Sequence, residues 1–219
     1  VWPLDTATMQ RGRPLTSAGT ERIAGSRDYV LHFREPVAGR IAAGNMLENA
    51  TLCPRLTVRN CRMLKQNRGR SILVTTPAKV LIENNYFHIA GASILFEGDG
   101  NFWFEQSGVR DVTIRNNIFA NGNYGSRGWG SACIAVGSGI SQRQTSRYHR
   151  NIQVDGNLFR VFDPRIVNLY CVDGFQFSAS NRIVRTSDYP ATFDPKLHFV
   201  FDQCDHIEIP RQIEMAEQR

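Results

Sequence analysis

The sequence predicts an all-β fold built as a solenoid of stacked coils, and three repeated segments carry this prediction. VLIENNYF, VTIRNNIF and IQVDGNLF begin at Val80, Val112 and Ile152, and each follows the pattern apolar, any, apolar, any, any, Asn, any, Phe. The two alternating apolar residues predict a short strand with one buried face. Because equivalent residues of stacked coils lie above one another, the repeat also predicts a hydrogen-bonded asparagine ladder with a phenylalanine stack beneath it. The ladder residues are Asn85, Asn117 and Asn157.

Weaker copies extend the repeat in both directions. LTVRNCRM places Cys61 in the Asn position and Met63 in the Phe position, whereas FQFSASNRI fits with one extra residue before Asn181. Short apolar runs between the copies predict the remaining strands of each coil: SILVTT, ASILF, CIAV, RIVNLY and HFVF. Only the tail IEMAEQR has a helical pattern.

The repeat divides the chain into two parts. Residues 55–219 form the predicted β-helix domain. Residues 1–54 lack the repeat, and we expect an irregular segment packed on the coil, with a strand pair at YVLHF and GRIAAG. The sequence shows no signal peptide and no apolar run long enough to cross a bilayer. It leaves open whether upstream coils or another chain in an oligomer complete the structure.

Composition limits the classes of partner and cofactor. The net charge is +6, but the basic residues are dispersed, so we expect no nucleic-acid binding, and an acidic polysaccharide is the more plausible anionic partner. Five cysteines without close spacing predict buried thiols and no disulfide framework. No metal-binding motif is visible, and we expect no cofactor.

The stretch ASILFEGDG, which ends at Gly100, carries the strongest chemical signal. Strand alternation places Ile94 and Phe96 on one face and Glu97 and Asp99 on the other. Alternate residues of a strand lie about 6.5–7 Å apart. This separation lets one carboxyl group protonate a leaving oxygen while the other activates water, as in inverting glycosidases. Glu105 follows as a third carboxylate.

Aromatic side chains accompany these carboxylates and predict a carbohydrate cleft, because aromatic faces stack on sugar rings. The first insertion, from Glu97 to Gly108, contains Phe102, Trp103 and Phe104. A second insertion, from Ala120 to Ala132, contains Tyr124, Arg127 and Trp129. Asp173, in CVDGF, fits a turn that could face the same side.

A purely structural interpretation of the same residues stays open. Asp99-Gly100-Asn101 could be an ordinary turn. Trp103 and Phe104 could close over the coil as packing, and Glu97 could pair with Arg110 or Arg115. His149, in RYHRN, fits a surface histidine that is hydrogen-bonded to backbone.

Read together, VLIENNYF, FEGDGNFWFEQSGVRDVTIRNNIF and YHRNIQVDGNLFRVFD resemble right-handed parallel β-helix proteins. More narrowly, the chain resembles glycoside hydrolase family 110, the α-1,3-galactosidases, from about Gly44 to Pro190. The GDxNxWxE stretch around Asp99, Trp103 and Glu105, followed by VDGF and SDYP, is its most specific part.

The resemblance implies an exo-acting, metal-independent, inverting α-galactosidase that is secreted or periplasmic and acts on a galactose-containing glycan. Asp99 would be the base or a substrate-binding carboxylate, followed by Glu105 and Glu97 as further catalytic candidates. Trp103 would be the sugar platform, with Trp129, Tyr124, Arg127 and Asp173 as other substrate contacts. The family tends to carry an acidic residue after the CIAV strand, where this chain has Gly137-Ser138-Gly139. Two alternatives therefore stay open: a binding or structural β-helix without catalysis, and a polysaccharide lyase.

Overall fold

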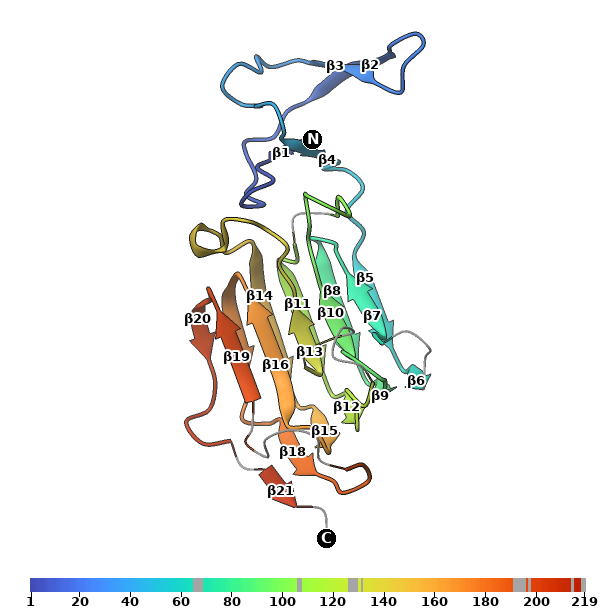
Figure 1. The fold of residues 1–219 in the computed structure, drawn as a ribbon, viewed down its shortest axis with the longest axis vertical. Helices are drawn as coiled ribbons and strands as arrows, with labels where there is room; N and C mark the ends of the chain where they lie inside the picture. Colours follow the sequence, from blue (N-terminus) through green and yellow to red (C-terminus); the bar gives the residue numbers. More distant parts are fainter. Residues whose placement is uncertain are drawn as a thin grey trace.

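The computed structural model describes residues 1–64, 69–105, 108–125, 130, 132–190, 196, 198–213 and 215–217. Its regular structure is β-strand apart from a short 3-10 helix at Arg143–Thr145. Within the described residues, no helix is long and apolar enough to cross a membrane. The main body contains three parallel sheets (Figure 1).

Each sheet is named here after one of its strands. The β10 sheet contains β7 (Ile72–Val74), β10 (Ile94–Phe96), β13 (Ile134–Val136), β16 (Arg165–Tyr170) and β19 (His198–Asp202). The β11 sheet contains β5 (Leu56–Arg59), β8 (Lys79–Glu83), β11 (Asp111–Arg115), β14 (His149–Asp155), β17 (Val172–Phe177) and β20 (Asp205–Glu208). The β12 sheet contains β6 (Arg62–Leu64), β9 (Tyr86–His88), β12 (Ile118–Ala120), β15 (Leu158–Val161), β18 (Arg182–Arg185) and β21 (Met215–Glu217).

Consecutive strands enter the three sheets in turn, so that each trio forms one coil. β10, β11 and β12 form one coil, and each strand pairs in parallel with its counterpart in the coil before and after it. The register places Val112 between Val80 and Ile152, the three residues that open the predicted repeats. The fold is therefore all-β with stacked parallel sheets, as predicted.

The asparagine ladder is confirmed. Asn85 Nδ2 donates to Asn117 Oδ1, Asn117 Nδ2 to Asn157 Oδ1, and Asn157 Nδ2 to Asn181 Oδ1, each at 3.0 Å. The same oxygens accept the backbone N–H groups of the preceding coil, and Asn85 Oδ1 accepts the N–H of Cys61 at 3.0 Å. Asn117 is fully buried. Each coil thus satisfies the buried polar groups of its neighbour, which fixes the stacking register.

The phenylalanine stack is also present. The ring centroids of Phe87 and Phe119 lie 5.1 Å apart, and those of Phe119 and Phe159 lie 4.6 Å apart with nearly parallel planes. Met63 pairs with Phe87 in register, as its place in the repeat predicts.

A second repeated position directly before the ladder was not predicted. The residues at this position have positive φ angles: Asn60 (58°), Asn84 (57°), Asn116 (55°) and Gly156 (62°). Only Gly and, to a lesser extent, Asn or Asp adopt this left-handed conformation readily. The repeat therefore has a conformational requirement here, and the chain turns from the β11 sheet into the β12 sheet at this position.

The N-terminal segment differs from its prediction. β3 (Tyr29–Phe33) pairs antiparallel with β2 (Ser17–Arg22) and not with GRIAAG, because a short connection brings β2 back alongside it. GRIAAG instead lies in turns, in which Arg40 N–H donates to the carbonyl of Val37. β1 (Trp2–Leu4) pairs antiparallel with β4 (Met46–Glu48). Leu4 and Met9 pack in one cluster with Ile140 and Tyr148.

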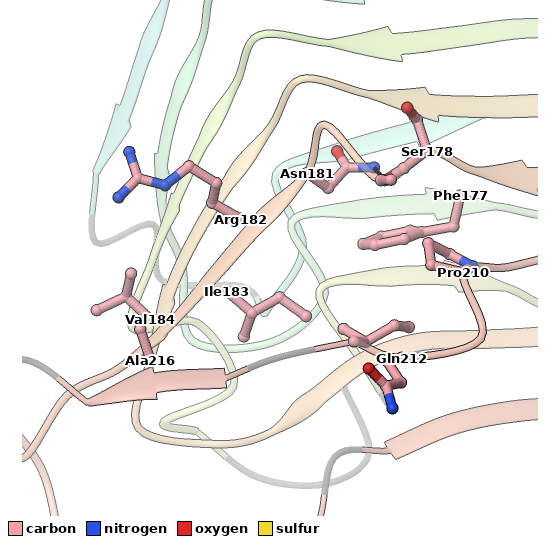
Figure 2. Close-up of a pocket in the computed structure, with 11 residues that line it drawn as sticks. Phe177, Ser178, Asn181, Arg182, Ile183, Val184, Pro210, Gln212 and Ala216 are labelled. Atoms are coloured by element: carbon pink, nitrogen blue, oxygen red, sulfur yellow. Dashed lines mark hydrogen bonds between the residues drawn. The ribbon is translucent and has the colours of Figure 1, made fainter.

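The predicted C-terminal helix is wrong. Residues Met215–Glu217 form β21, which pairs in parallel with β18. The exposed hydrogen-bonding edge of β18 offers partners that a helix of a few residues cannot supply for itself. A cavity of about 650 Å³ lies at this end of the stack, between β18 and the segment around Gln212, and Phe177 and Ile183 line it (Figure 2).

Candidate active site

The first insertion begins directly after β10, at the corner where the chain leaves the β10 sheet for the β11 sheet. Ile94 and Phe96 are fully buried in the core, and Leu95 faces the other way, as strand alternation predicts. β10 ends at Phe96, however, so the alternation does not extend to Asp99. Glu97 and Asp99 consequently have different environments.

The Asp99 carboxylate closes a turn. It is 5% exposed and accepts backbone N–H groups from Asn101 at 2.7 Å, Phe102 at 3.0 Å and Trp103 at 2.7 Å. The Asp99 carbonyl also accepts the N–H of Glu105 at 2.7 Å. This geometry favours a role in shaping the loop, since both carboxylate oxygens already have donors.

Glu97 points onto the outside of the coil beside an arginine. Its Oε2 lies 3.8 Å from Arg70 Nη1, and its side chain is 28% exposed. Burial raises the pKa of Glu97, and Asp99 raises it further, whereas the Arg70 guanidinium opposes the shift. The hypothesis that Glu97 pairs with Arg110 or Arg115 is wrong, because Arg70 is its partner and Arg115 binds Glu83 at 2.7 Å.

Glu105 completes a pair of carboxyl groups with Glu97. Its Oε2 atom is buried and has no hydrogen-bond partner among the residues that the structure describes. Burial raises the pKa of Glu105, and the charges of Glu97 and Asp99 raise it further, whereas the Arg70 guanidinium opposes the shift. A carboxyl group in such surroundings tends to hold its proton, which is the property of a general acid.

The next coil supplies the surface beside Glu97. A Cβ atom placed on Gly137 would lie 3.2 Å from Glu97 Oε1, and one placed on Gly139 would lie 3.7 Å from Asp99 Oδ1. The glycines after the CIAV strand therefore leave room for the carboxylates of the preceding coil.

Two neighbouring buried residues hold these loops in place. The Tyr148 hydroxyl donates to the Gly98 carbonyl at 2.8 Å. The His149 Nε2–H group donates to the Gly137 carbonyl at 3.0 Å, and Nδ1 accepts the N–H of Val109 at 3.3 Å. The expected backbone bonding of His149 is confirmed, but its expected surface location is wrong, since the side chain is fully buried.

His149 predicts an acid-sensitive stability. Burial lowers the pKa of His149 to about 3 in the folded protein, whereas its pKa in the unfolded chain is about 6.5. Between these two pH values the unfolded chain binds a proton at His149 and the folded chain does not. The free energy of unfolding should fall by up to about 1.4 kcal/mol per pH unit between these values. His149→Gln removes this pH dependence. In urea unfolding, the free energy of unfolding of the variant should therefore lie less far below that of the wild type at pH 5 than at pH 7.

His206 provides a matched control for this prediction. Its hydrogen bond to Asp173 raises its pKa, so its contribution is present at low pH and is lost as the pH rises through the folded value. His206→Gln should therefore shift the pH dependence in the opposite direction. If His149→Gln lowers the free energy of unfolding by the same amount at both pH values, this explanation of His149 is wrong.

The aromatic side chains of the first insertion are exposed. Phe102, Trp103 and Phe104 are 72%, 68% and 67% exposed, and the first two rings meet edge to face at 4.8 Å. The alternative that Trp103 and Phe104 close over the coil as packing is therefore wrong. These rings are free to contact a ligand.

The second insertion precedes β13, whereas the first insertion follows β10. Because β10 and β13 are parallel neighbours, the two insertions lie at opposite ends of these strands. Tyr124 stacks on Tyr189 with centroids 5.7 Å apart, and the His88 ring lies 5.2 Å from Tyr124 at a tilt of 32°. Arg127 and Trp129 lie outside the described residues. The described geometry brings Tyr124 together with other aromatic rings and not with Glu97 and Glu105.

Asp173 lies in a strand rather than in the expected turn. It belongs to β17 in the β11 sheet, and its Oδ1 lies 2.6 Å from His206 Nδ1. The described contact of Asp173 is thus with His206 of the neighbouring strand β20 and not with Glu97 or Glu105.

Curated relatives match most of this chain, although no family model does. Alpha-1,3-galactosidase B of Bacteroides thetaiotaomicron is 35% identical over 184 residues, which is 83% of this chain and 30% of that protein. Alpha-1,3-galactosidase A of Bacteroides fragilis is 34% identical over 200 residues, 90% of this chain and 33% of that protein. Over these residues the chain is similar to the α-1,3-galactosidases, and it spans about a third of the length of these two relatives. Shewanella woodyi alpha-1,3-galactosidase A, 35% identical over 163 residues, covers 74% of the chain, and the chain spans 26% of its length.

Sequence reasoning did not single out three residues of this galactosidase-like site: Arg70, Gly137 as the neighbour of Glu97, and Tyr148. Arg70 precedes a strand one coil away and gives no local signal. Gly137 stands where the family tends to carry an acidic residue, and its contact with Glu97 has no sequence signal. Tyr148, directly before His149, offered the one usable signal, since an aromatic-polar pair at the start of a repeat strand is unusual in this chain.

Proposed function

We propose that this chain carries the catalytic centre of a glycoside hydrolase that removes terminal α-linked galactose with inversion, on a right-handed, single-stranded parallel β-helix. The observation that carries the proposal is that Glu97, beside Arg70, lies close enough to raise the pKa of Glu105, whose buried Oε2 has no partner among the described residues. The kinship with the α-1,3-galactosidases supports the choice of substrate.

Burial raises the pKa of both carboxyl groups, and we assign their roles from their neighbours, since Glu97 lies 3.8 Å from the Arg70 guanidinium. Glu105 holds a proton and donates it to the glycosidic oxygen as the bond to the anomeric carbon breaks. Glu97, favoured in its ionised form by Arg70, accepts a proton from the water that attacks from the opposite face of the sugar. The released galactose then has the β configuration.

The exposed rings of the first insertion would form the sugar platform. Trp103 lies two residues before Glu105, and its backbone is fixed by the Asp99 carboxylate. We assign Asp99 the task of holding this loop, so that the platform and the acid keep a constant separation. Trp103 presents the flat apolar face on which a galactose ring can stack.

Arg70→Met tests the division of roles. Loss of the guanidinium raises the pKa of Glu97, so the acidic limb of the pH profile of kcat/KM should move to higher pH and the maximum should fall. Arg115→Met is the matched control, because Arg115 pairs with Glu83 elsewhere. A profile of Arg70→Met that keeps the wild-type acidic limb would contradict this role.

The function itself is tested by galactose release from an α-1,3-linked galactosyl disaccharide, measured with a galactose dehydrogenase coupling system. We expect turnover by the wild type and none by the double variant Glu97→Gln/Glu105→Gln. Binding of the disaccharide without any turnover would instead favour the non-catalytic alternative.

A secreted or periplasmic location fits a galactose-containing glycan as the substrate, and we propose it on that ground. The lyase alternative has less support. Such lyases use a calcium site, and the described residues contain no group of three metal-binding side chains.

A further inference from the structure

The outer face of the β11 sheet carries a groove that is separate from the carboxylate pair. Two hollows of about 570 Å³ and 430 Å³ adjoin there and share Gln153, Gln176 and Glu208. The cavity at the end of the stack shares Phe177 and Pro210 with the larger hollow (Figure 2). The two hollows therefore form one groove on this face, and the cavity at the end of the stack adjoins it.

A row of hydrogen-bonding side chains forms the floor of the groove. Thr113 pairs in register with Gln153, Gln153 with Gln176, and Gln176 with Glu208. Neighbouring strands lie about 4.8 Å apart, so the row extends over about 14 Å. This length suits an oligosaccharide rather than a single sugar ring.

These side chains are available to a ligand. Gln153, Gln176 and Glu208 are exposed, while Phe175 and Phe177, on either side of Gln176 in β17, point into the core. Gln176 Nε2 donates to Glu208 Oε2 at 3.1 Å. Within the part of the chain that the structure describes, the Gln153 side chain has no hydrogen-bond partner, and its amide can serve as both donor and acceptor.

The charges in the groove select against a polyanion. Its lining includes three carboxylates, from Asp111, Asp155 and Glu208. The basic groups of the lining have carboxylate partners, since Arg115 pairs with Glu83 at 2.7 Å and His206 with Asp173 at 2.6 Å. Hydrogen bonds from Ser180 and Ser178 lower the pKa of Asp155, so it remains ionised. Nucleic acid and sulfated glycans would meet like charge here. Neutral hydroxyl groups, by contrast, can bond to amides and carboxylates alike.

We propose that this groove is a second carbohydrate site, which binds a neutral oligosaccharide along the row from Thr113 to Glu208. It rests on the proposed function only for the class of ligand. The site holds the glycan on a face of the coil next to the one that carries the carboxylates. Substitutions in the groove should therefore weaken binding of the oligosaccharide without changing the cleavage of the glycosidic bond.

The test uses the whole chain and a neutral probe, a linear galactan hexasaccharide, in a ¹⁵N NMR titration. We expect the side-chain amide signals of Gln153 and Gln176 to shift in the wild type. In Gln153→Ala/Gln176→Ala, the dissociation constant read from backbone signals of β14 and β17 should rise at least tenfold. Gln144→Ala, an exposed glutamine outside the groove, is the matched control and should bind as the wild type does.

Equal affinity of the double variant and the wild type would overturn the proposal. So would the absence of wild-type binding, or binding of a heparin hexasaccharide in preference to the neutral probe. Hydrolysis of 4-nitrophenyl α-galactoside is followed in parallel and should be unchanged in the double variant, since this substrate has no glycan chain. If the wild type fails to hydrolyse it, the proposed function fails while the titration still decides the groove.

Discussion

Glu105→Gln is expected to lower kcat/KM for an α-1,3-galactosyl disaccharide by roughly 10²–10⁴-fold, the usual contribution of a general acid. The disaccharide has a poor leaving group, which must be protonated as the bond breaks. A 2,4-dinitrophenyl galactoside needs no such assistance, so the same variant should lose little activity on it. Parallel measurement of the two substrates therefore isolates the acid role of Glu105.

Glu97→Gln is the matched comparison, because loss of the base impairs the attack of water whatever the leaving group. We expect similar losses on both substrates. Asp99→Asn should behave differently from both, since its carboxylate binds three backbone N–H groups and its loss disturbs the loop. If Glu105→Gln keeps full activity on the disaccharide, Glu105 is not the acid.

Asn117→Ala is expected to produce the largest loss of stability. The change removes the acceptor of two Asn85 donors and the donor to Asn157, all in a fully buried position. It also leaves the Ile82 carbonyl without the amide that binds it at 2.9 Å. Each buried group without a partner costs about 1–3 kcal/mol, so the free energy of unfolding should fall by roughly 3 kcal/mol or more.

Asn181→Ala is the control at the end of the ladder. Asn181 Oδ1 accepts the Asn157 N–H as well as Nδ2, but Asn181 is half-buried, so water can reach this N–H, and Nδ2 also donates to the carbonyls of Ile114 and Asp155. Water and these carbonyls can replace the lost acceptor, and we expect a loss of about 1 kcal/mol. Denaturant titration of both variants compares the two positions. A loss for Asn117→Ala no larger than that for Asn181→Ala would argue against the ladder as a source of stability.

The repeat predicted the fold well because its signal is local. Asn85, Asn117 and Asn157 occupy the same place in each copy, and stacking turns that place into a contact. The left-handed position of Asn84, Asn116 and Gly156 has an equally local signal, because only Asn or Gly recurs there and these residues adopt a positive φ most readily.

The site was only partly predictable, because its contacts join different coils. Glu97, Glu105 and Trp103 were identified from composition in one loop. The turn at Asp99 depends on where β10 ends, and the pairing of Arg70 with Glu97 depends on coil stacking that local spacing does not encode. The helix predicted for the C-terminal tail was wrong for the same reason, because pairing with β18 determines the conformation of Met215–Glu217.

The most direct test of the proposed chemistry is ¹H NMR of the first galactose that the wild type releases from an α-galactoside, recorded before mutarotation. A base and an acid at Glu97 and Glu105 predict β-galactose as the initial product. Initial release of α-galactose would contradict the account, because it requires a carboxylate that attacks the sugar directly.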